Sequence, residues 1–168
     1  KIYSVRDLIE EVGTDAARFF FLMRSVDSHL DFDLDLARRQ TEENPVYYVQ
    51  YAHARICSIE KQAEERGFKF ETAPDLSALG EDAEITLMRK LADYPHELQE
   101  AAKDRAPHRL TNYLRELTQT FHQFYTQCQV LAEEDRSTST ARMALCEATR
   151  QVLRNCLNIL GITAPESM

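Results

Sequence analysis

The stretch Asn44–Arg66, NPVYYVQYAHARICSIEKQAEER, has the features of one long helix. Asn44 is a favoured N-cap, Pro45 suits the first helical position, and Gly67 is a natural stop. Apolar positions recur at helical spacing and form one stripe, which contains Val46, Val49, His53, Ile56 and Cys57. The pattern therefore predicts a helix of about six turns with one buried face.

Patterns elsewhere in the chain predict an all-α fold. The sequence has only four glycines and five prolines, and no alternating β-branched run. We expect a helical bundle with a short helical lead-in. The other expected helices are Ser4–Val12, with Ser4 and Asp7 as a capping box, Thr14–Met23, with Thr14 as the cap, Glu81–Asp93, Pro95–Arg105, Pro107 to about Cys128, and Ala141–Leu160.

Two segments are expected to connect these helices. Asp27–Gln40, DSHLDFDLDLARRQ, alternates Asp with Leu or Phe, and Asp35 is placed to cap a short helix. A metal site formed by Asp31, Asp33 and Asp35 is the alternative interpretation. Phe68–Asp82, FKFETAPDLSALGED, is predicted to be the longest loop.

Charge and cysteine usage limit the class of protein. The net charge of -8 argues against a nucleic-acid partner, although a local basic face is compatible with an acidic remainder. The four cysteines lack metal-binding spacing, so we expect buried reduced thiols and a cytoplasmic protein. No apolar run reaches the roughly 18 residues of a membrane span. Since the chain begins at Lys1 without an initiator Met, we expect it to be a piece of a longer protein or a protein with its start removed.

No catalytic signature is present in the sequence. There is no glycine-rich phosphate loop, zinc spacing or H-E-x-x-H motif, so we expect no catalytic residue and no metal or cofactor in this chain. For the five histidines, a core or capping role is favoured over catalysis: His29, His53, His96, His108 and His122. The residues alone favour a binding module.

A second face of the Asn44–Arg66 helix carries aromatic and cationic side chains. Tyr48, Tyr51 and Arg55 fall within about 60° on a helical wheel, away from the apolar stripe. Tyr125 lies off the apolar stripe of a later helix. Packing between helices would explain the tyrosines. Stacking of unpaired nucleic-acid bases on Tyr and Arg planes is the functional alternative.

Four segments resemble the C-terminal part of bacterial arginyl-tRNA synthetases. Two are EEVGTDAARFFFLMRSVDSHLDFDLDLA and ENPVYYVQYAHARICSI, at 10–37 and 43–59, and two are YLRELTQTFHQFYTQCQVL and LNILGITAPESM, at 113–131 and 157–168. The resemblance implies a class I enzyme that joins arginine to its tRNA using ATP with Mg²⁺. It implies residues 1–40 as the junction after a missing catalytic domain, and 41–168 as the anticodon-binding domain.

The resemblance also names candidate contacts to the anticodon loop of tRNA, namely Tyr48, Tyr51, Arg55, Tyr125 and Met168. The class I signatures of the HIGH and KMSKS type are absent, so ATP and arginine binding are expected outside this chain. The implied partners are an arginine-accepting tRNA and the catalytic domain, with no DNA or membrane. The alternative, a helical protein–protein interaction module without an RNA role, remains open at this point.

Overall fold

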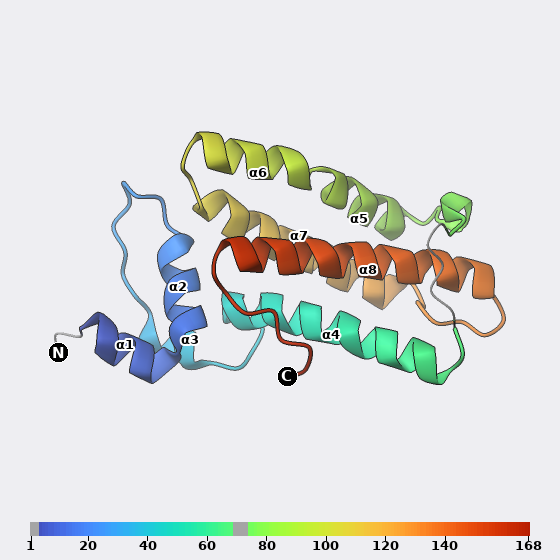
Figure 1. The fold of residues 1–168 in the computed structure, drawn as a ribbon, viewed down its shortest axis with the longest axis horizontal. Helices are drawn as coiled ribbons and strands as arrows, with labels where there is room; N and C mark the ends of the chain where they lie inside the picture. The colour runs from blue at the N-terminus through green and yellow to red at the C-terminus, as the bar shows by residue number, and fades with distance from the viewer. Residues whose placement is uncertain (1–3, 69–73) are drawn as a thin grey trace.

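The computed structural model describes residues 4–68 and 74–168, and every regular element in these ranges is a helix (Figure 1). This confirms the all-α prediction. The elements are α1 Val5–Val12, α2 Thr14–Leu22, α3 Leu34–Arg38, α4 Pro45–Glu65, the 3-10 helix η1 Leu76–Ala78, α5 Asp82–Ala92, α6 Tyr94–Lys103, α7 His108–Gln127 and α8 Arg136–Ile159.

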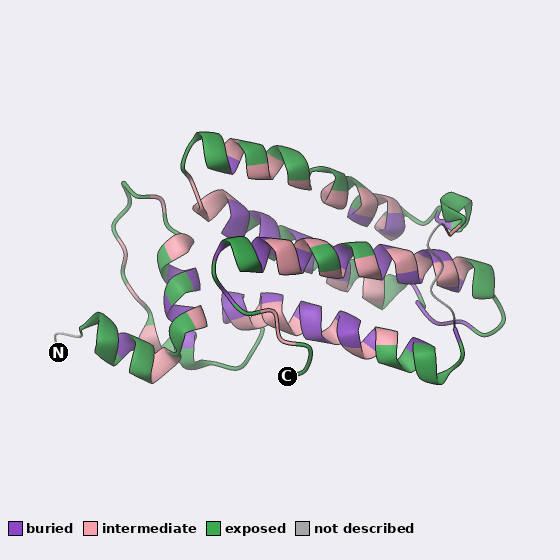
Figure 2. Cartoon of the chain, in the orientation of Figure 1, coloured by how far each residue is buried: buried purple, intermediate pink, exposed green. Residues whose placement is uncertain are grey.

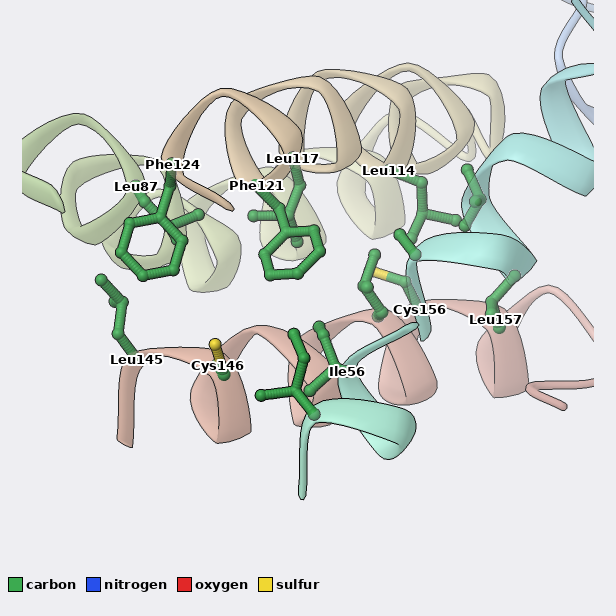
Figure 3. Packing of buried hydrophobic residues seen from close by; sticks show 14 of the residues in the cluster. Ile56, Leu87, Leu114, Leu117, Phe121, Phe124, Leu145, Cys146, Cys156 and Leu157 are labelled. Atoms are coloured by element: carbon green, nitrogen blue, oxygen red, sulfur yellow. The ribbon is translucent and has the colours of Figure 1, made fainter. Parts of the chain in front are cut away.

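The bundle is centred on α4, α7 and α8, which pack against one another, while α5 and α6 pack on α7. The residues predicted for the α4 stripe are all buried, and their relative exposure does not exceed 5%. The α7 stripe, ending at Phe121, Phe124 and Cys128, is buried as predicted. Figure 3 shows Phe121 and Phe124 facing the side chains of α8. Each fully buried large side chain of this kind contributes about 1.5–3 kcal/mol.

The lead-in helices α1, α2 and α3 lie at one end of the bundle (Figure 1), and α2 contacts α4 and α7. Phe19 and Phe20 of α2 are buried. Phe21 of the same helix is 44% exposed and contacts Phe32 of the connector. Figure 2 shows the same contrast along α2, where buried and exposed residues alternate.

Three predicted helix starts are wrong. Asp33, rather than Asp35, caps α3 by accepting a hydrogen bond from the backbone N–H of Leu36 at 2.9 Å. Asp35 instead pairs with Arg38 at 3.5 Å. These aspartates therefore have structural partners, and no group of metal-binding side chains occurs among the residues that the model describes.

The cap of α2 is Gly13, without a side-chain hydrogen bond, and Thr14 is the first helical residue. Helix α8 begins five residues earlier than predicted, at Arg136 instead of Ala141. Asp135 accepts the backbone N–H of Thr138 at 3.0 Å and so starts the helix inside the polar EEDRSTST segment. Residues 69–73 of the predicted long loop lie outside the described ranges.

The four cysteines, Cys57, Cys128, Cys146 and Cys156, are free and buried, as predicted. Burial raises the pKa of each thiol above its ordinary value, and for Cys156 the pKa reaches about 12. The thiols therefore behave as small apolar groups of the core. Within 4–68 and 74–168, no helix combines the length and apolar character needed to cross a membrane.

Candidate nucleic-acid interface

Tyr48, Tyr51 and Arg55 lie on one face of α4 and are half-buried, as the helical wheel predicts. The structure adds Tyr125 of α7 to this face. Arg55 Nη2 donates a hydrogen bond to the Tyr125 hydroxyl at 2.7 Å, and the guanidinium carbon lies 4.8 Å from the centre of the Tyr125 ring. The contact fixes the plane of Arg55, because a guanidinium held by both an acceptor and a ring loses most of its rotational freedom.

His122 of α7 completes the face, and sequence reasoning missed it as a site residue. Its ring centre lies 5.1 Å from that of Tyr48 and 6.1 Å from that of Tyr51, where the planes differ by 25°. We call Tyr48, Tyr51, His122 and Tyr125 the aromatic row. A usable signal was present, since His122 precedes Tyr125 by three residues and so shares its helix face.

Burial changes the ionisation of two members of the row, His122 and Tyr48. Burial lowers the pKa of His122, Glu42 opposes this shift, and Arg55 adds to it, so the imidazole is neutral at pH 7. The Nε2 of His122 is buried and has no hydrogen-bond partner among the residues that the model describes. Burial, together with the charge of Glu42, raises the pKa of Tyr48. The row therefore offers neutral aromatic planes beside one fixed cation, Arg55.

The other histidines lie away from the row. His53 is fully buried in the α4 stripe, and the pKa of its imidazole is lowered by burial. His29 and His96 are exposed, so of the two expected roles, core or capping, the core role does not apply to them.

The C-terminal segment, residues 161–168, returns along α4 (Figure 1) and ends beside the aromatic row. His53 Nδ1 lies 2.8 Å from the carbonyl oxygen of Pro165, to which it donates, and Gln50 Nε2 donates to the carbonyl of Thr163 at 3.0 Å. Asp15 of α2 accepts the Thr163 N–H at 3.2 Å. These bonds hold the segment against both the bundle and the lead-in.

Two hollows flank the row. The tail pocket has a volume of about 350 Å³ and is lined by residues of α4 and of the C-terminal segment: Tyr51, Ala54, Arg55, Ser58, Lys61, Glu166, Ser167 and Met168. Met168 is 55% exposed. The polar pocket, of about 310 Å³, lies between the start of α4 and the middle of α7, and its lining consists of Glu42, Glu43, Pro45, Tyr48, Asn112, Arg115, Glu116 and Gln119. Of the five predicted contact residues, Tyr48, Tyr51 and Tyr125 belong to the aromatic row, while Arg55 and Met168 line the tail pocket.

Chemically, the arrangement can stack planar groups and neutralise limited negative charge. The fold and this surface define a helical-bundle binding domain. The sequence profile of the DALR anticodon-binding domain matches residues 49–168, and the chain belongs to this family.

Relatives across bacteria give a consistent assignment. The chain is 50% identical to arginine–tRNA ligase 1 of Halalkalibacterium halodurans over all of its 168 residues, and 55% identical to the arginine–tRNA ligase of Caldanaerobacter subterraneus. It spans 30% of the length of each of these proteins. These comparisons give no support to a protein–protein interaction module as the alternative.

Solved structures agree with this assignment. The putative arginyl-tRNA synthetase of Campylobacter jejuni superposes with a TM-score of 0.82 at 28% identity, over 100% of this chain and 37% of that one. The arginyl-tRNA synthetase of Thermus thermophilus gives a TM-score of 0.79 at 31% identity, over 94% of this chain and 27% of that one.

Proposed function

We propose that this chain binds the anticodon loop of an arginine-accepting tRNA as the C-terminal part of an arginine–tRNA ligase. The observation that carries the proposal is the aromatic row with Arg55 locked against Tyr125, open to solvent through the tail pocket. Unstacked loop bases bind to such planes, and each stacked base contributes about 1–3 kcal/mol. Tyr48, Tyr51, Arg55, Tyr125 and Met168 are the proposed contacts.

The acidic net charge is compatible with this role. Single-stranded loops are held by stacking as well as by phosphate neutralisation, and a short loop needs few cations. Arg55 and Lys61 line the tail pocket, where Glu166 is the only acidic side chain among the described lining residues. We therefore expect weak binding whose affinity falls only gradually as the salt concentration rises.

Aminoacylation itself is assigned to a catalytic domain that precedes this chain in the longer protein and that binds ATP, Mg²⁺ and arginine. Residues 1–40 are proposed as the junction to that domain, and residues 41–168 as the tRNA-binding unit, in a cytoplasmic enzyme. The hydrogen bonds of Asp15 to the C-terminal segment support a mechanical link between the junction and the tail pocket.

The test is a titration of a fluorescent 17-nucleotide hairpin carrying a seven-nucleotide arginine anticodon loop. Tyr51→Ala should weaken binding about 10-fold or more, the loss of one stacked base. Tyr94→Ala is the matched control, because Tyr94 is also half-buried against one tyrosine ring but lies on α6. Equal affinity of wild type and Tyr51→Ala, with both folded by circular dichroism, would refute the proposal. Competition by unrelated proteins rather than RNA would favour the protein-binding alternative.

A further inference from the structure

The polar pocket is not accounted for by the predicted contacts, of which it includes only Tyr48. Its α7 wall is formed by Asn112, Arg115, Glu116 and Gln119, all exposed. Asn112, Arg115 and Gln119 follow one another at intervals of three and four, and His122 comes three residues after Gln119. They therefore form one stripe along α7 that runs into the aromatic row.

The wall residues have the chemistry to read a base edge. The side-chain amides of Asn112 and Gln119 each carry two donors and an acceptor, which is the combination that pairs with two neighbouring atoms of a nucleobase. Tyr48 supplies an aromatic plane in the same hollow. A volume of about 310 Å³ accommodates one planar base.

Charge in and around this pocket favours a base over a phosphate. Three carboxylates line it, those of Glu42, Glu43 and Glu116, and Arg115 is the one cation among its lining residues. Two further cations lie just outside, because Arg39 pairs with Glu43 and Lys90 pairs with Glu116. Three negative and three positive charges cancel, so the pocket offers no net attraction for phosphate, while its acceptors suit the amino groups of a base.

The pocket is continuous with the surface already described. Tyr48 lines the polar pocket and Tyr51 lines the tail pocket, and both rings contact His122. Residues three apart on a helix are separated by about 4.5 Å along its axis. A few nucleotides of one unpaired loop can therefore reach both pockets at once.

The geometry points to a second nucleobase subsite, formed by Tyr48 with Asn112, Arg115 and Gln119, that seats another unpaired base of the same RNA loop. The inference rests on the proposed function, since it assigns a further part of the same interface. In this subsite Tyr48 stacks on the base, and the side chains of Asn112, Arg115 and Gln119 read its edge.

The experiment uses the same hairpin with a single abasic site placed at each loop position in turn. Asn112→Ala and Gln119→Ala should each weaken binding of the intact hairpin about 5- to 20-fold. At one loop position, the abasic site should weaken hairpin binding by the wild type but should cause no further loss in the Asn112→Ala/Gln119→Ala variant. At a different loop position, the abasic site should weaken binding by the wild type but should cause no further loss in Tyr51→Ala. Two different positions are expected because each variant removes the binding partner of a different base.

A matched control separates the possible failures. Gln123→Ala removes an exposed glutamine of α7 that does not line the pocket, so it should not match the loss caused by Gln119→Ala. If Tyr51→Ala weakens binding but Asn112→Ala and Gln119→Ala do not, the second subsite is refuted while the proposed function stands. If Tyr51→Ala is also silent, both fail. If Gln119→Ala and Gln123→Ala weaken binding equally, the loss is nonspecific and the subsite is refuted.

Discussion

A buried ion pair joins α5 to α8, and breaking it should destabilise the whole bundle. Glu84 is fully buried, and its Oε1 lies 2.6 Å from Nε of Arg142, which is 15% exposed. Glu84 Oε2 accepts the backbone N–H groups of Gly80 at 2.8 Å and Glu81 at 2.9 Å. Arg142 Nη1 also donates to the carbonyl of Gln129 at 2.9 Å. The variant that tests this arrangement is Arg142→Met, which keeps the apolar stem.

The expected loss in the free energy of unfolding of Arg142→Met depends on the Glu84 carboxylate, which stays buried without its cation. Removing one partner of a buried pair leaves an uncompensated charge and costs about 3–5 kcal/mol. The two backbone donors to Glu84 persist, which places the loss near the lower end, and the exposed Gln129 carbonyl can bond to water instead. For a chain of this size, a loss of about 3 kcal/mol lowers Tm by about 6–12 °C. Glu84→Gln keeps an acceptor oxygen and leaves Arg142 near solvent, so it should cost less, about 1–2 kcal/mol.

The assay is urea unfolding followed by circular dichroism at the helical band, with thermal melts in parallel. Arg109→Met is the control, since the Arg109–Glu97 pair at 3.1 Å has side chains 34% and 28% exposed, and it should cost at most about 1 kcal/mol. The reasoning is refuted if Arg142→Met lies within 1 kcal/mol of wild type, or if Glu84→Gln proves the more destabilising change.

Three other outcomes are expected. Burial raises the pKa of the Glu60 carboxyl to about 7, and a hydrogen bond to Glu147 adds to the shift. Between about pH 4.5 and 7 the folded state therefore binds more protons than the unfolded state, so the free energy of unfolding falls as the pH rises. Glu60→Gln should remove this fall, which urea titrations at about pH 5 and pH 8 would measure. Gly161 has a φ of +67°, and an added Cβ would meet Arg18, so Gly161→Ala should cost about 1–2 kcal/mol and speed hydrogen exchange in the C-terminal segment. Tyr125→Phe removes the acceptor of Arg55 and should weaken hairpin binding about fivefold in the fluorescence titration, while unchanged affinity would mean that this bond does not orient the guanidinium.

The sequence was most informative where one helix contained the whole signal. Val46, Val49, Ile56 and their neighbours could be assigned to a buried stripe because periodicity depends only on positions along α4. Helix starts were less predictable. Asp33 and Asp35 are equally acceptable as caps by residue type, and in the structure it is Asp33 that accepts the backbone N–H of Leu36.

The start of α8 shows the same limit. EEDRSTST is too polar to suggest a core helix, yet Ser139 is 1% exposed and its hydroxyl exchanges hydrogen bonds with the backbone of Ala132 at 2.8 and 3.1 Å. That partner comes from the preceding loop. Tertiary contacts therefore extend the helix beyond its intrinsic preference.

For the candidate site, the wheel of α4 grouped Tyr48, Tyr51 and Arg55, and the family resemblance added Tyr125 and Met168. Neither could place His122 between the two tyrosines, because that position depends on the register of α7 against α4. The polar pocket also combines residues from two helices and could not be read from either one. Pairwise register between helices is the information that a single sequence lacks.

The four buried thiols give this chain a built-in reporter of unfolding. Alkylating reagents attack the thiolate, and here burial both blocks access and raises each pKa, so native molecules should react only after opening. The rate of labelling would then measure opening of α4, α7 and α8 one helix at a time, by mass spectrometry. A cysteine introduced on the surface could also carry a dye at one chosen place, without competition from the native thiols.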